Sequence, residues 1–193
     1  DNVGARGLWG KSNMYEESAA VPLIMAGPDI PQGICDTPVS LLDVSATIAA
    51  HFGTEIDAAD GVRDLRSILS EPVQKDRVVF SEYHAAGAVS GAFMLRKGAW
   101  KLIHYVGFPD ELFHLEDDPQ ECTNRAEDPA CIDILKDLHQ ELRKICEPDV
   151  VNEMAFADQA ALIAHHGGRE AALKLGAAGA TPPPEAAPSG DRT

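Results

Sequence analysis

The sequence lacks an apolar run of the roughly 20 residues that cross a bilayer, so it predicts no membrane span. It begins with Asp1 rather than Met and shows no recognisable signal peptide, which suggests a fragment of a longer protein. Close cysteine pairs are absent as well, because no C-x-x-C spacing joins Cys35, Cys122, Cys131 and Cys146. Neither a zinc cluster nor a thioredoxin-like motif is therefore indicated. The redox compartment and the localisation stay open, with a cytoplasmic location favoured over a periplasmic one.

Positive charge is scarce, because 16 lysines and arginines stand against 31 aspartates and glutamates and leave a net charge of −15. A surface of this sign repels the phosphate backbone of nucleic acids, so no nucleic-acid partner is expected. An anionic substrate would need a local positive charge against this field, which draws attention to a lysine within a glycine-rich stretch. Hydrophobic residues make up 45% of the 193 positions, enough for one modest core with a small satellite.

The chain opens with a glycine-rich stretch that leads into a short apolar run. Gly4, Gly7 and Gly10 recur too closely for a stable helix, so residues 1–20 are expected to form a loop with a short helical turn. Residues 21–26 are aliphatic and are followed by Gly-Pro, which is typical of a strand buried on both faces. On its own, the glycine spacing indicates a plain flexible loop rather than a phosphate cradle.

A helix and a linker follow this run. Thr37 and Pro38 predict an N-cap and a proline at the first helical position, and Gly53 predicts the C-terminal stop. Within the helix, Asp43 is interpreted as a solvated or capping acid. Residues 56–76 predict a linker that holds one short helix. The apolar face of the first helix is marked at helical spacing by Leu41, Val44, Ile48 and Phe52.

From residue 77 onward the hydrophobic period changes from helical to strand-like. Lys97 and Gly98 form a turn signal, so the runs on either side are expected to pair as a hairpin. Asp128 and Pro129 predict the start of a helix after the sheet. Four strand-like runs predict a small antiparallel sheet, at residues 77–84, 91–96, 100–106 and 111–115. The helix stripe that is expected to cover one face of this sheet comprises Ile132, Leu135, Leu138, Leu142 and Ile145.

The C-terminal part of the sequence predicts a helical tail over residues 148–175, with Asn152 as its cap. Two roles for this tail are open: it wraps the domain, or it packs on a neighbouring subunit and supports a homo-oligomer. Residues 176–193 are rich in Ala, Pro and Gly and cannot form a packed core, so they are expected to be disordered.

Two stretches resemble the sulfatases of the alkaline phosphatase superfamily. The first is DNVGARGLWGKSNMYEES at residues 1–18, followed by VPLIMAGP at residues 21–28. The second is ELFHLEDDP at residues 111–119, followed by Asn124, and it is similar to a stretch in the C-terminal subdomain of these enzymes. The resemblance spans residues 1–147 and implies that the chain is only the C-terminal portion of a sulfatase.

The resemblance implies an α/β fold in two parts. Residues 1–55 would form the C-terminal edge of the main alkaline-phosphatase-like α/β sandwich, with one strand and one helix of its sheet. Residues 77–147 would form the small four-stranded antiparallel sheet with its covering helix. A strand, a loop and a helix in this order also suit the edge of an α/β sheet on general grounds.

The resemblance also implies the chemistry. Such enzymes oxidise a cysteine or serine within Cys/Ser-x-Pro-x-Arg to a formylglycine that attacks sulfur, while a divalent cation polarises the ester. Cys146-Glu-Pro and Ser70-Glu-Pro lack the arginine, so the nucleophile is expected upstream of the chain. The Asp-His metal ligands of the family would stand immediately before Asp1. The cation, calcium first and manganese or magnesium as alternatives, is therefore expected to be bound by residues outside the chain.

Three residues are candidates for the site. Lys11 occupies the position where the family carries a lysine near the sulfate oxygens and the leaving group, and a compact ammonium suits charge that moves onto a departing oxygen. His84 follows a strand and His104 lies inside one; both are candidate substrate-binding residues. Glu16 and Glu17 are interpreted as structural acids that tie the loop backbone. The expected substrate is a small-molecule sulfate ester, with phosphonate or phosphate ester hydrolysis and a noncatalytic truncated module as alternatives.

Overall fold

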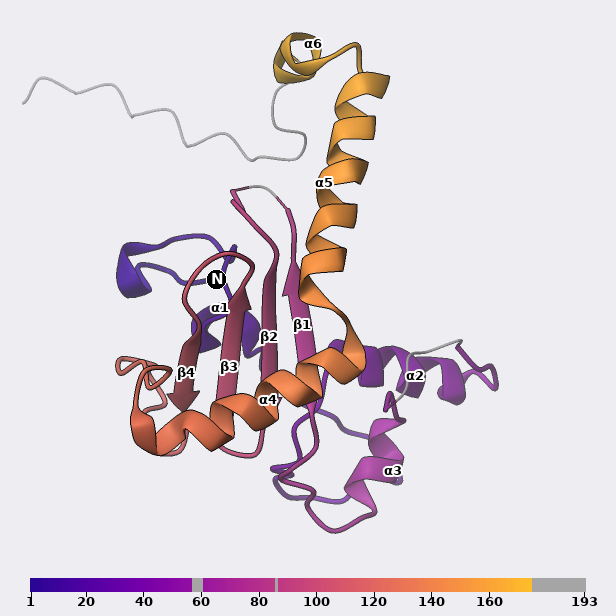
Figure 1. Ribbon diagram of the computed structural model, residues 1–193. Helices are drawn as coiled ribbons and strands as arrows, with labels where there is room; N and C mark the ends of the chain where they lie inside the picture. Colours follow the sequence, from indigo (N-terminus) through magenta and orange to yellow (C-terminus); the bar gives the residue numbers. More distant parts are fainter. Residues whose placement is uncertain (57–60, 86, 175–193) are drawn as a thin grey trace, which may run out of the picture. The chain divides into compact units, whose positions relative to one another are not determined.

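The computed structural model describes residues 1–56, 61–85 and 87–174, and the chain divides into two compact units, Asp1–Glu153 and Met154–Thr193. Figure 1 shows the elements in chain order. They are η1 (Ala5–Gly7), α1 (Glu16–Ala19), α2 (Leu41–His51), α3 (Leu65–Leu69), β1 (Val79–Tyr83), β2 (Ala92–Lys97), β3 (Trp100–Tyr105), β4 (Glu111–His114), η2 (Pro129–Cys131), α4 (Ile132–Ile145), α5 (Pro148–His165) and α6 (Arg169–Lys174).

The central element is a four-stranded sheet whose strands follow the chain order β1-β2-β3-β4, each antiparallel to its neighbour. Its register is set by pairs such as Leu95↔Leu102. The predicted hairpin is confirmed, because β2 and β3 pair up to Lys97↔Trp100. Gly98 in the turn has a φ of +62°, a left-handed conformation that glycine adopts without strain. The prediction of four antiparallel strands is thus confirmed as well.

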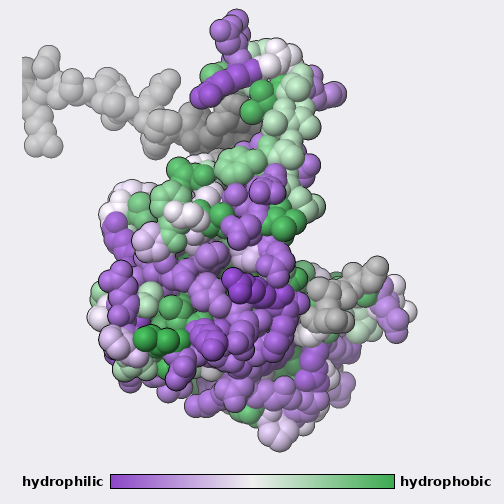
Figure 2. Space-filling model, viewed as in Figure 1, coloured by the Kyte–Doolittle hydropathy of each residue, from purple (hydrophilic) through white to green (hydrophobic). Residues whose placement is uncertain are grey.

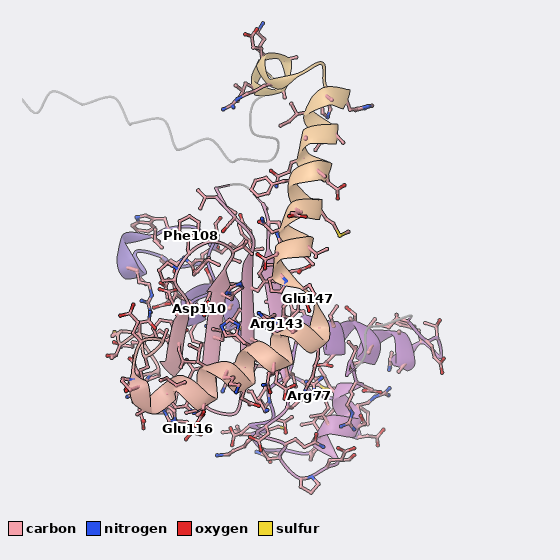
Figure 3. All side chains as sticks on the ribbon, viewed as in Figure 1. Arg77, Phe108, Asp110, Glu116, Arg143 and Glu147 are labelled. Carbon is pink, nitrogen blue, oxygen red and sulfur yellow. The ribbon has the colours of Figure 1, made fainter. Side chains whose placement is uncertain are left out.

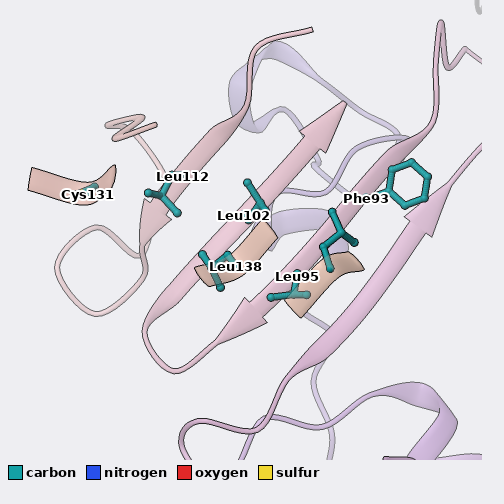
Figure 4. Close-up of a cluster of buried hydrophobic side chains, with 7 residues drawn as sticks. Phe93, Leu95, Leu102, Leu112, Cys131 and Leu138 are labelled. Carbon is teal, nitrogen blue, oxygen red and sulfur yellow. The ribbon is translucent and has the colours of Figure 1, made fainter. Parts of the chain in front are cut away.

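Helix α4 covers one face of the sheet and is mostly hydrophilic on its outer side (Figures 1 and 2). Leu138 and Leu142 of the predicted stripe are buried, whereas Ile132 and Ile145 are largely exposed. The prediction was wrong for these two isoleucines because they stand at the ends of α4, which extends past the edge strands. The core between helix and sheet is shown in Figure 4 and comprises Phe93, Leu95, Leu102, Leu112, Cys131, Leu138 and Leu142.

The N-terminal segment covers the opposite face of the sheet. Successive side chains of a strand alternate between the two faces, so each strand also contributes to a second cluster. From the N-terminal segment, Met14 is buried in this second cluster, and Ala19 of α1 packs against the cluster. The loop predicted for residues 1–20 is confirmed, with two short helical turns, η1 and α1, where one was expected. The second cluster comprises Met14, Ala92, Met94, Ile103, Phe113 and Leu115.

Residues 21–26 do not form a strand, so that prediction was wrong. The segment lacks regular secondary structure, and Ile24 is 93% exposed. A strand buried on both faces needs neighbouring strands for its backbone hydrogen bonds, and the four strands of the described residues all belong to the sheet that begins at Val79. The residue types favour a strand, but strand formation depends on partners that a local pattern cannot supply.

Helix α2 starts later than predicted. Ser40, not Thr37, is its N-cap, in a capping box where Asp43 accepts a hydrogen bond from the backbone N–H of Ser40 at 2.8 Å. The hydroxyl oxygen of Thr37 instead accepts a hydrogen bond from the backbone N–H of Gln74. The predicted stop is confirmed, because Gly53 follows the helix with a left-handed φ of +70°.

Asp43 is buried rather than solvated, and the capping role is confirmed. Its carboxylate accepts hydrogen bonds from both terminal nitrogens of Arg77, at 2.8 and 2.9 Å, and from the backbone of Ser40 and Arg63. Burial alone would raise the pKa of Asp43, but these hydrogen bonds outweigh it and hold the pKa below its ordinary value. Arg77, labelled in Figure 3, therefore joins α2 to the start of the sheet.

Helix α5 begins at Pro148, before the predicted cap at Asn152. Proline is favoured at the first helical position because a backbone N–H there would have no acceptor within the helix, so its absence costs nothing. Asn152 instead accepts a hydrogen bond from the backbone N–H of Gly91 at 2.7 Å. The tail predicted to be disordered, residues 176–193, lies outside the described residues, and the role in a homo-oligomer stays a prediction. No helix in the described part of the chain is long and apolar enough to cross a bilayer.

Asp43→Ala in the full-length protein should destabilise the fold by about 3–5 kcal/mol, because it leaves the mostly buried Arg77 without its partner. The pKa of Asp43 is lower in the folded chain than the value of about 3.9 for an unfolded aspartate. The carboxylate therefore adds stability above that pH, and this stability is lost as the pH falls through the folded-state pKa. Urea unfolding between about pH 7 and pH 3 measures both effects.

The matched control is Asp137→Ala, which removes an exposed partner of Lys97. Surface ion pairs contribute little, so this change should cost less than about 1 kcal/mol and should leave the pH dependence of stability nearly unchanged. Equal losses of unfolding free energy in Asp43→Ala and Asp137→Ala would contradict a stabilising role for the buried Asp43–Arg77 pair.

Candidate functional site

The N-terminal loop closes on itself through one buried asparagine. Asn2 donates from its backbone N–H to the carbonyl of Gly10 at 3.0 Å and from its side chain to the same carbonyl and to Ser18 Oγ. Gly4 and Gly7 adopt left-handed φ angles of +93° and +71°, which let the backbone turn back within this short span. The loop therefore has a defined backbone in spite of its glycine content.

Lys11 follows this closure directly. Its side chain is 77% exposed, and its ammonium lies 3.9 Å from the carboxylate of Asp1. At the next residue, the hydroxyl of Tyr83 donates to Ser12 Oγ at 3.1 Å and ties the loop to the end of β1. Hydrogen bonds thus hold the loop at the Gly10 carbonyl before Lys11 and at the Ser12 side chain after it, while the ammonium stays accessible to an anion.

A buried lysine of β3 anchors the segment that follows the loop. The ammonium of Lys101 is 0% exposed and lies 2.8 Å from Glu16 Oε1 and 2.7 Å from Glu121 Oε1. The second oxygen of Glu121 accepts a hydrogen bond from the backbone N–H of Glu16 at 2.7 Å. Buried charges are tolerated only when each is paired. The cluster therefore fixes α1 against the sheet, which agrees with the structural role predicted for Glu16.

A second set of contacts holds the loop from the side. The guanidinium of Arg6 lies 3.9 Å from the ring centre of Tyr15 and donates to the backbone carbonyls of Gln120 and Glu121. The hydroxyl of Tyr15 donates to Glu111 Oε1 at 2.6 Å. Burial, and then this contact with a carboxylate, raises the pKa of Tyr15 well above its ordinary value, so the phenol stays protonated. Arg6 and Tyr15 thus attach the loop to β4 and to the turn after it.

His104 lies on the face of the sheet that carries α4, where it meets two residues that the sequence did not single out. Its Nδ1 lies 2.7 Å from Oδ1 of Asp110, and Nε2 of His139 on α4 lies 2.7 Å from Oδ2 of the same carboxylate. Burial would raise the pKa of Asp110, but the hydrogen bonds to both imidazoles outweigh it and lower the pKa well below its usual range. Asp110, labelled in Figure 3, is therefore an ionised carboxylate shared by two histidines.

His84 packs on the same face of the sheet as His104. Its ring lies edge-on to Phe93 with the ring centroids 5.2 Å apart, and Phe93 also lies 6.4 Å from the ring of His104. Lys11, in contrast, precedes Met14, which packs on the opposite face. The structure thus brings the two histidines to one aromatic ring, whereas the segment that carries Lys11 packs on the opposite face. The roles of all three residues stay predictions.

A groove of about 770 Å³ lies between residues 19–23, residues 35–44 and the edge of the sheet at β1. Lys75 and Glu116, which form an ion pair at 3.6 Å, lie at its border. Lys11, His84 and His104 are not among its lining residues. This groove therefore does not connect the candidate residues with one another.

The sequence analysis missed Lys101, Asp110 and His139 because most of their partners are distant along the chain. Periodicity could have indicated the first and the last of these residues. Alternation along the strand puts Lys101 on the same face as the apolar Ile103, which indicates burial. Helical spacing puts His139 on the face of Leu142, three residues later, and so on the side of α4 that meets the sheet. Asp110 lies in the connection between β3 and β4, where no regular periodicity of the sequence indicates the direction of a side chain.

Comparison with known proteins connects this arrangement with one group of enzymes. Residues 4–148 match the family model described as N-sulphoglucosamine sulphohydrolase, C-terminal. The choline-sulfatase of Rhizobium meliloti strain 1021 is 40% identical over 133 residues, which cover 67% of this chain and 26% of that protein. The arylsulfatase K of Danio rerio is 32% identical over 148 residues, which cover 71% of this chain and 28% of that protein. A solved putative sulfatase from Bacteroides thetaiotaomicron VPI-5482 aligns with a TM-score of 0.63 and 28% identity, over 75% of this chain and 33% of that chain.

The fold and its relatives define the class first: this is the C-terminal part of a sulfatase fold, as the resemblance implied. More particularly, the chain belongs to the family of the N-sulphoglucosamine sulphohydrolase C-terminal domain. The predicted fold class is confirmed by the same findings. The chain spans about a quarter of the length of the curated relatives that it matches.

The family implies a divalent cation and a formylglycine in general, and the described residues fit neither a calcium ion, the cation expected first, nor a formylglycine. Their one cluster of three or more potential metal ligands consists of His104, Asp110 and His139. Two imidazoles and one carboxylate suit a zinc-type ion, whereas calcium takes about six to eight oxygen ligands. Cys146 ends α4, where burial raises the pKa of its thiol, and Ser70 ends α3. No catalytic step through a calcium ion or a formylglycine is therefore assigned to residues of this chain.

Lys101→Met should release the N-terminal loop, because it leaves Glu121 buried without its ammonium partner. The expected cost is about 3–5 kcal/mol in the free energy of unfolding, as for other broken buried pairs. Hydrogen exchange of the full-length protein should become faster in residues 1–20, while residues 92–97 stay protected. Lys101→Met combined with Glu121→Gln should recover part of the loss, since the second change removes the unpaired charge. Unchanged exchange of the loop in Lys101→Met would rule out this anchoring role.

Proposed function

We propose that this chain is the C-terminal domain of a metal-dependent sulfatase that hydrolyses sulfate esters, with its N-terminal loop as one wall of the active site. The observation that carries the proposal is Lys11, an exposed ammonium in a loop that Asn2 holds at Gly10 and Tyr83 holds at the side chain of Ser12. The family match over residues 4–148 supports the class of reaction.

Lys11 would bind the sulfuryl oxygens and stabilise the departing oxygen. The three N–H donors of a compact ammonium can follow negative charge as it moves from the sulfuryl group to the leaving group. In a chain with a net charge of −15, a local positive charge also gives an anionic ester a place of favourable potential. Calcium is the proposed cation, with manganese and magnesium as alternatives, and the formylglycine would come from a Cys or Ser outside this chain.

Among sulfate esters, the charge of the chain favours one that carries a cationic group. One relative is named a choline-sulfatase, and choline sulfate holds a quaternary ammonium beside its sulfate. A chain with 31 acidic against 16 basic residues attracts the quaternary ammonium of such an ester and repels a polyanion. The proposed substrate is therefore a small sulfate ester with a cationic leaving group rather than a sulfated polysaccharide. Phosphonate or phosphate ester hydrolysis and a noncatalytic module are the alternatives.

Lys11→Ala in the full-length protein should lower the turnover of choline sulfate and of aryl sulfates by about 10²- to 10³-fold, as for the loss of one preorganised charge-stabilising group. Lys11→Arg should recover little, because a planar guanidinium does not replace a compact point charge. The loss should be smaller for esters whose leaving group departs readily. Steady-state rates across aryl sulfates of graded leaving-group pKa, with metal content checked in each variant, measure this.

Lys144→Ala is the matched control, because Lys144 is similarly exposed and lies on α4, away from the loop. It should keep wild-type rates. Near-wild-type rates for Lys11→Ala with every ester would return Lys11 to the role of a solvated lysine. Turnover of phosphonate but not sulfate esters by the wild type would favour the first alternative, and no turnover of any ester would favour the noncatalytic module.

A further inference from the structure

A second candidate site lies on the face of the sheet that carries α4. His104, Asp110 and His139 come from three separate elements there: β3, the connection between β3 and β4, and α4. Their potential ligand atoms all lie within 4.8 Å of one another. From this geometry we propose that His104 Nδ1, His139 Nε2 and the carboxylate of Asp110 bind a divalent transition-metal ion of the zinc type.

The donor set selects the class of ion. Two imidazole nitrogens and one carboxylate oxygen form a ligand set that zinc, cobalt and iron(II) accept, with a position left for water. Calcium and magnesium prefer oxygen ligands. At zinc bond lengths of about 2.0–2.2 Å, tetrahedral ligand atoms stand ~3.3–3.6 Å apart. The nitrogen–oxygen contacts of 2.7 Å, which use the two different oxygens of Asp110, would widen by less than about 1 Å, and the ligand atoms that now lie up to 4.8 Å apart would close to the same spacing.

The charge of the cluster also favours a cation. Asp110 is ionised, and within residues 1–56, 61–85 and 87–174 no lysine or arginine forms an ion pair with its carboxylate. A metal ion would replace the protons between Asp110 and the two rings, and each neutral ring would carry its proton on the other nitrogen. The side chains of the three residues are 20–26% exposed, so an ion and a water molecule can reach them.

The surroundings hold the ligands in place before an ion binds. The ring of His104 packs against Phe93 and lies 5.3 Å from that of His139, at an interplanar angle of 82°. The backbone carbonyl of Asp110 accepts a hydrogen bond from the side-chain amide of Asn124 at 3.0 Å. Because β3 and α4 already pack through a buried core, a bound ion would fasten the helix to the sheet.

Zinc binding by the full-length protein tests this site, and the result does not depend on whether the protein is a sulfatase. The protein is stripped with a chelator, returned to saturating calcium and titrated with zinc, while bound zinc and the thermal midpoint are measured. Wild type should bind one zinc ion more per chain than Asp110→Asn or His139→Gln, whose affinity should be at least about 100-fold weaker. Zinc should raise the thermal midpoint of wild type but not of these two variants, and cobalt(II) bound to wild type should give the visible absorption of a histidine-bound ion.

The matched control is His114→Gln, because His114 pairs with Asp117 at 3.0 Å outside the cluster. This variant should keep wild-type zinc affinity. If Asp110→Asn fails to fold, His139→Gln and the cobalt spectrum of wild type decide the question. Zinc bound elsewhere, as at the adjacent His165 and His166, would be the same in every variant. Zinc affinity no tighter in wild type than in His139→Gln, or lost in His114→Gln, would overturn the proposal and leave a hydrogen-bonded Asp–His contact.

Discussion

The buried ammonium of Lys101 is the interaction on which the rest of the structure depends. It stands in a central strand, and removing such a charge from water is costly unless carboxylates meet it there. The chain supplies them from opposite sides in sequence, Glu16 before the sheet and Glu121 after it. The charge of Lys101 in the central strand is therefore paired only when the segments that carry Glu16 and Glu121 both pack on the same face of the sheet. This requirement, more than any property of the glycine-rich loop itself, decides where the loop lies.

Alternation along β3 gives the two faces of the sheet different chemistry. Lys101 and Ile103 meet the N-terminal segment, whereas Leu102 and His104 lie on the side of α4. The first face carries the ion cluster and the lysine loop, and the second carries an apolar core bordered by the histidines. One strand thus positions both candidate sites. A one-residue slip in its pairing would send every side chain to the wrong face, so the register is constrained from both sides.

What could be predicted from the sequence was what local signals determine. Alternation and a glycine turn predict the hairpin, and the contiguous motif around Lys11 predicts the loop. The supposed strand at residues 21–26 failed because a ladder needs partners, and residue types do not report whether partners are present. The buried ion pairs could not be predicted for the same reason. Lys101 contacts a glutamate 85 residues away, and His139 contacts an aspartate 29 residues away. Contacts of that length are decided by the fold rather than by the neighbouring sequence.

The N-terminal loop separates the two demands of the proposed catalysis, which are orientation and adaptability. Charge stabilises a transition state best when its position is set before the reaction, because little reorganisation is then needed. A lysine side chain carries about 2 kcal/mol of rotamer entropy, and a mobile backbone beneath it would add an ordering cost of about 1–2 kcal/mol per residue. The hydrogen bonds of Asn2 to the Gly10 carbonyl and of Tyr83 to the Ser12 side chain reduce the second cost by restraining the loop on both sides of Lys11. The side chain alone is left free to move, which suits a charge that follows an oxygen as it departs.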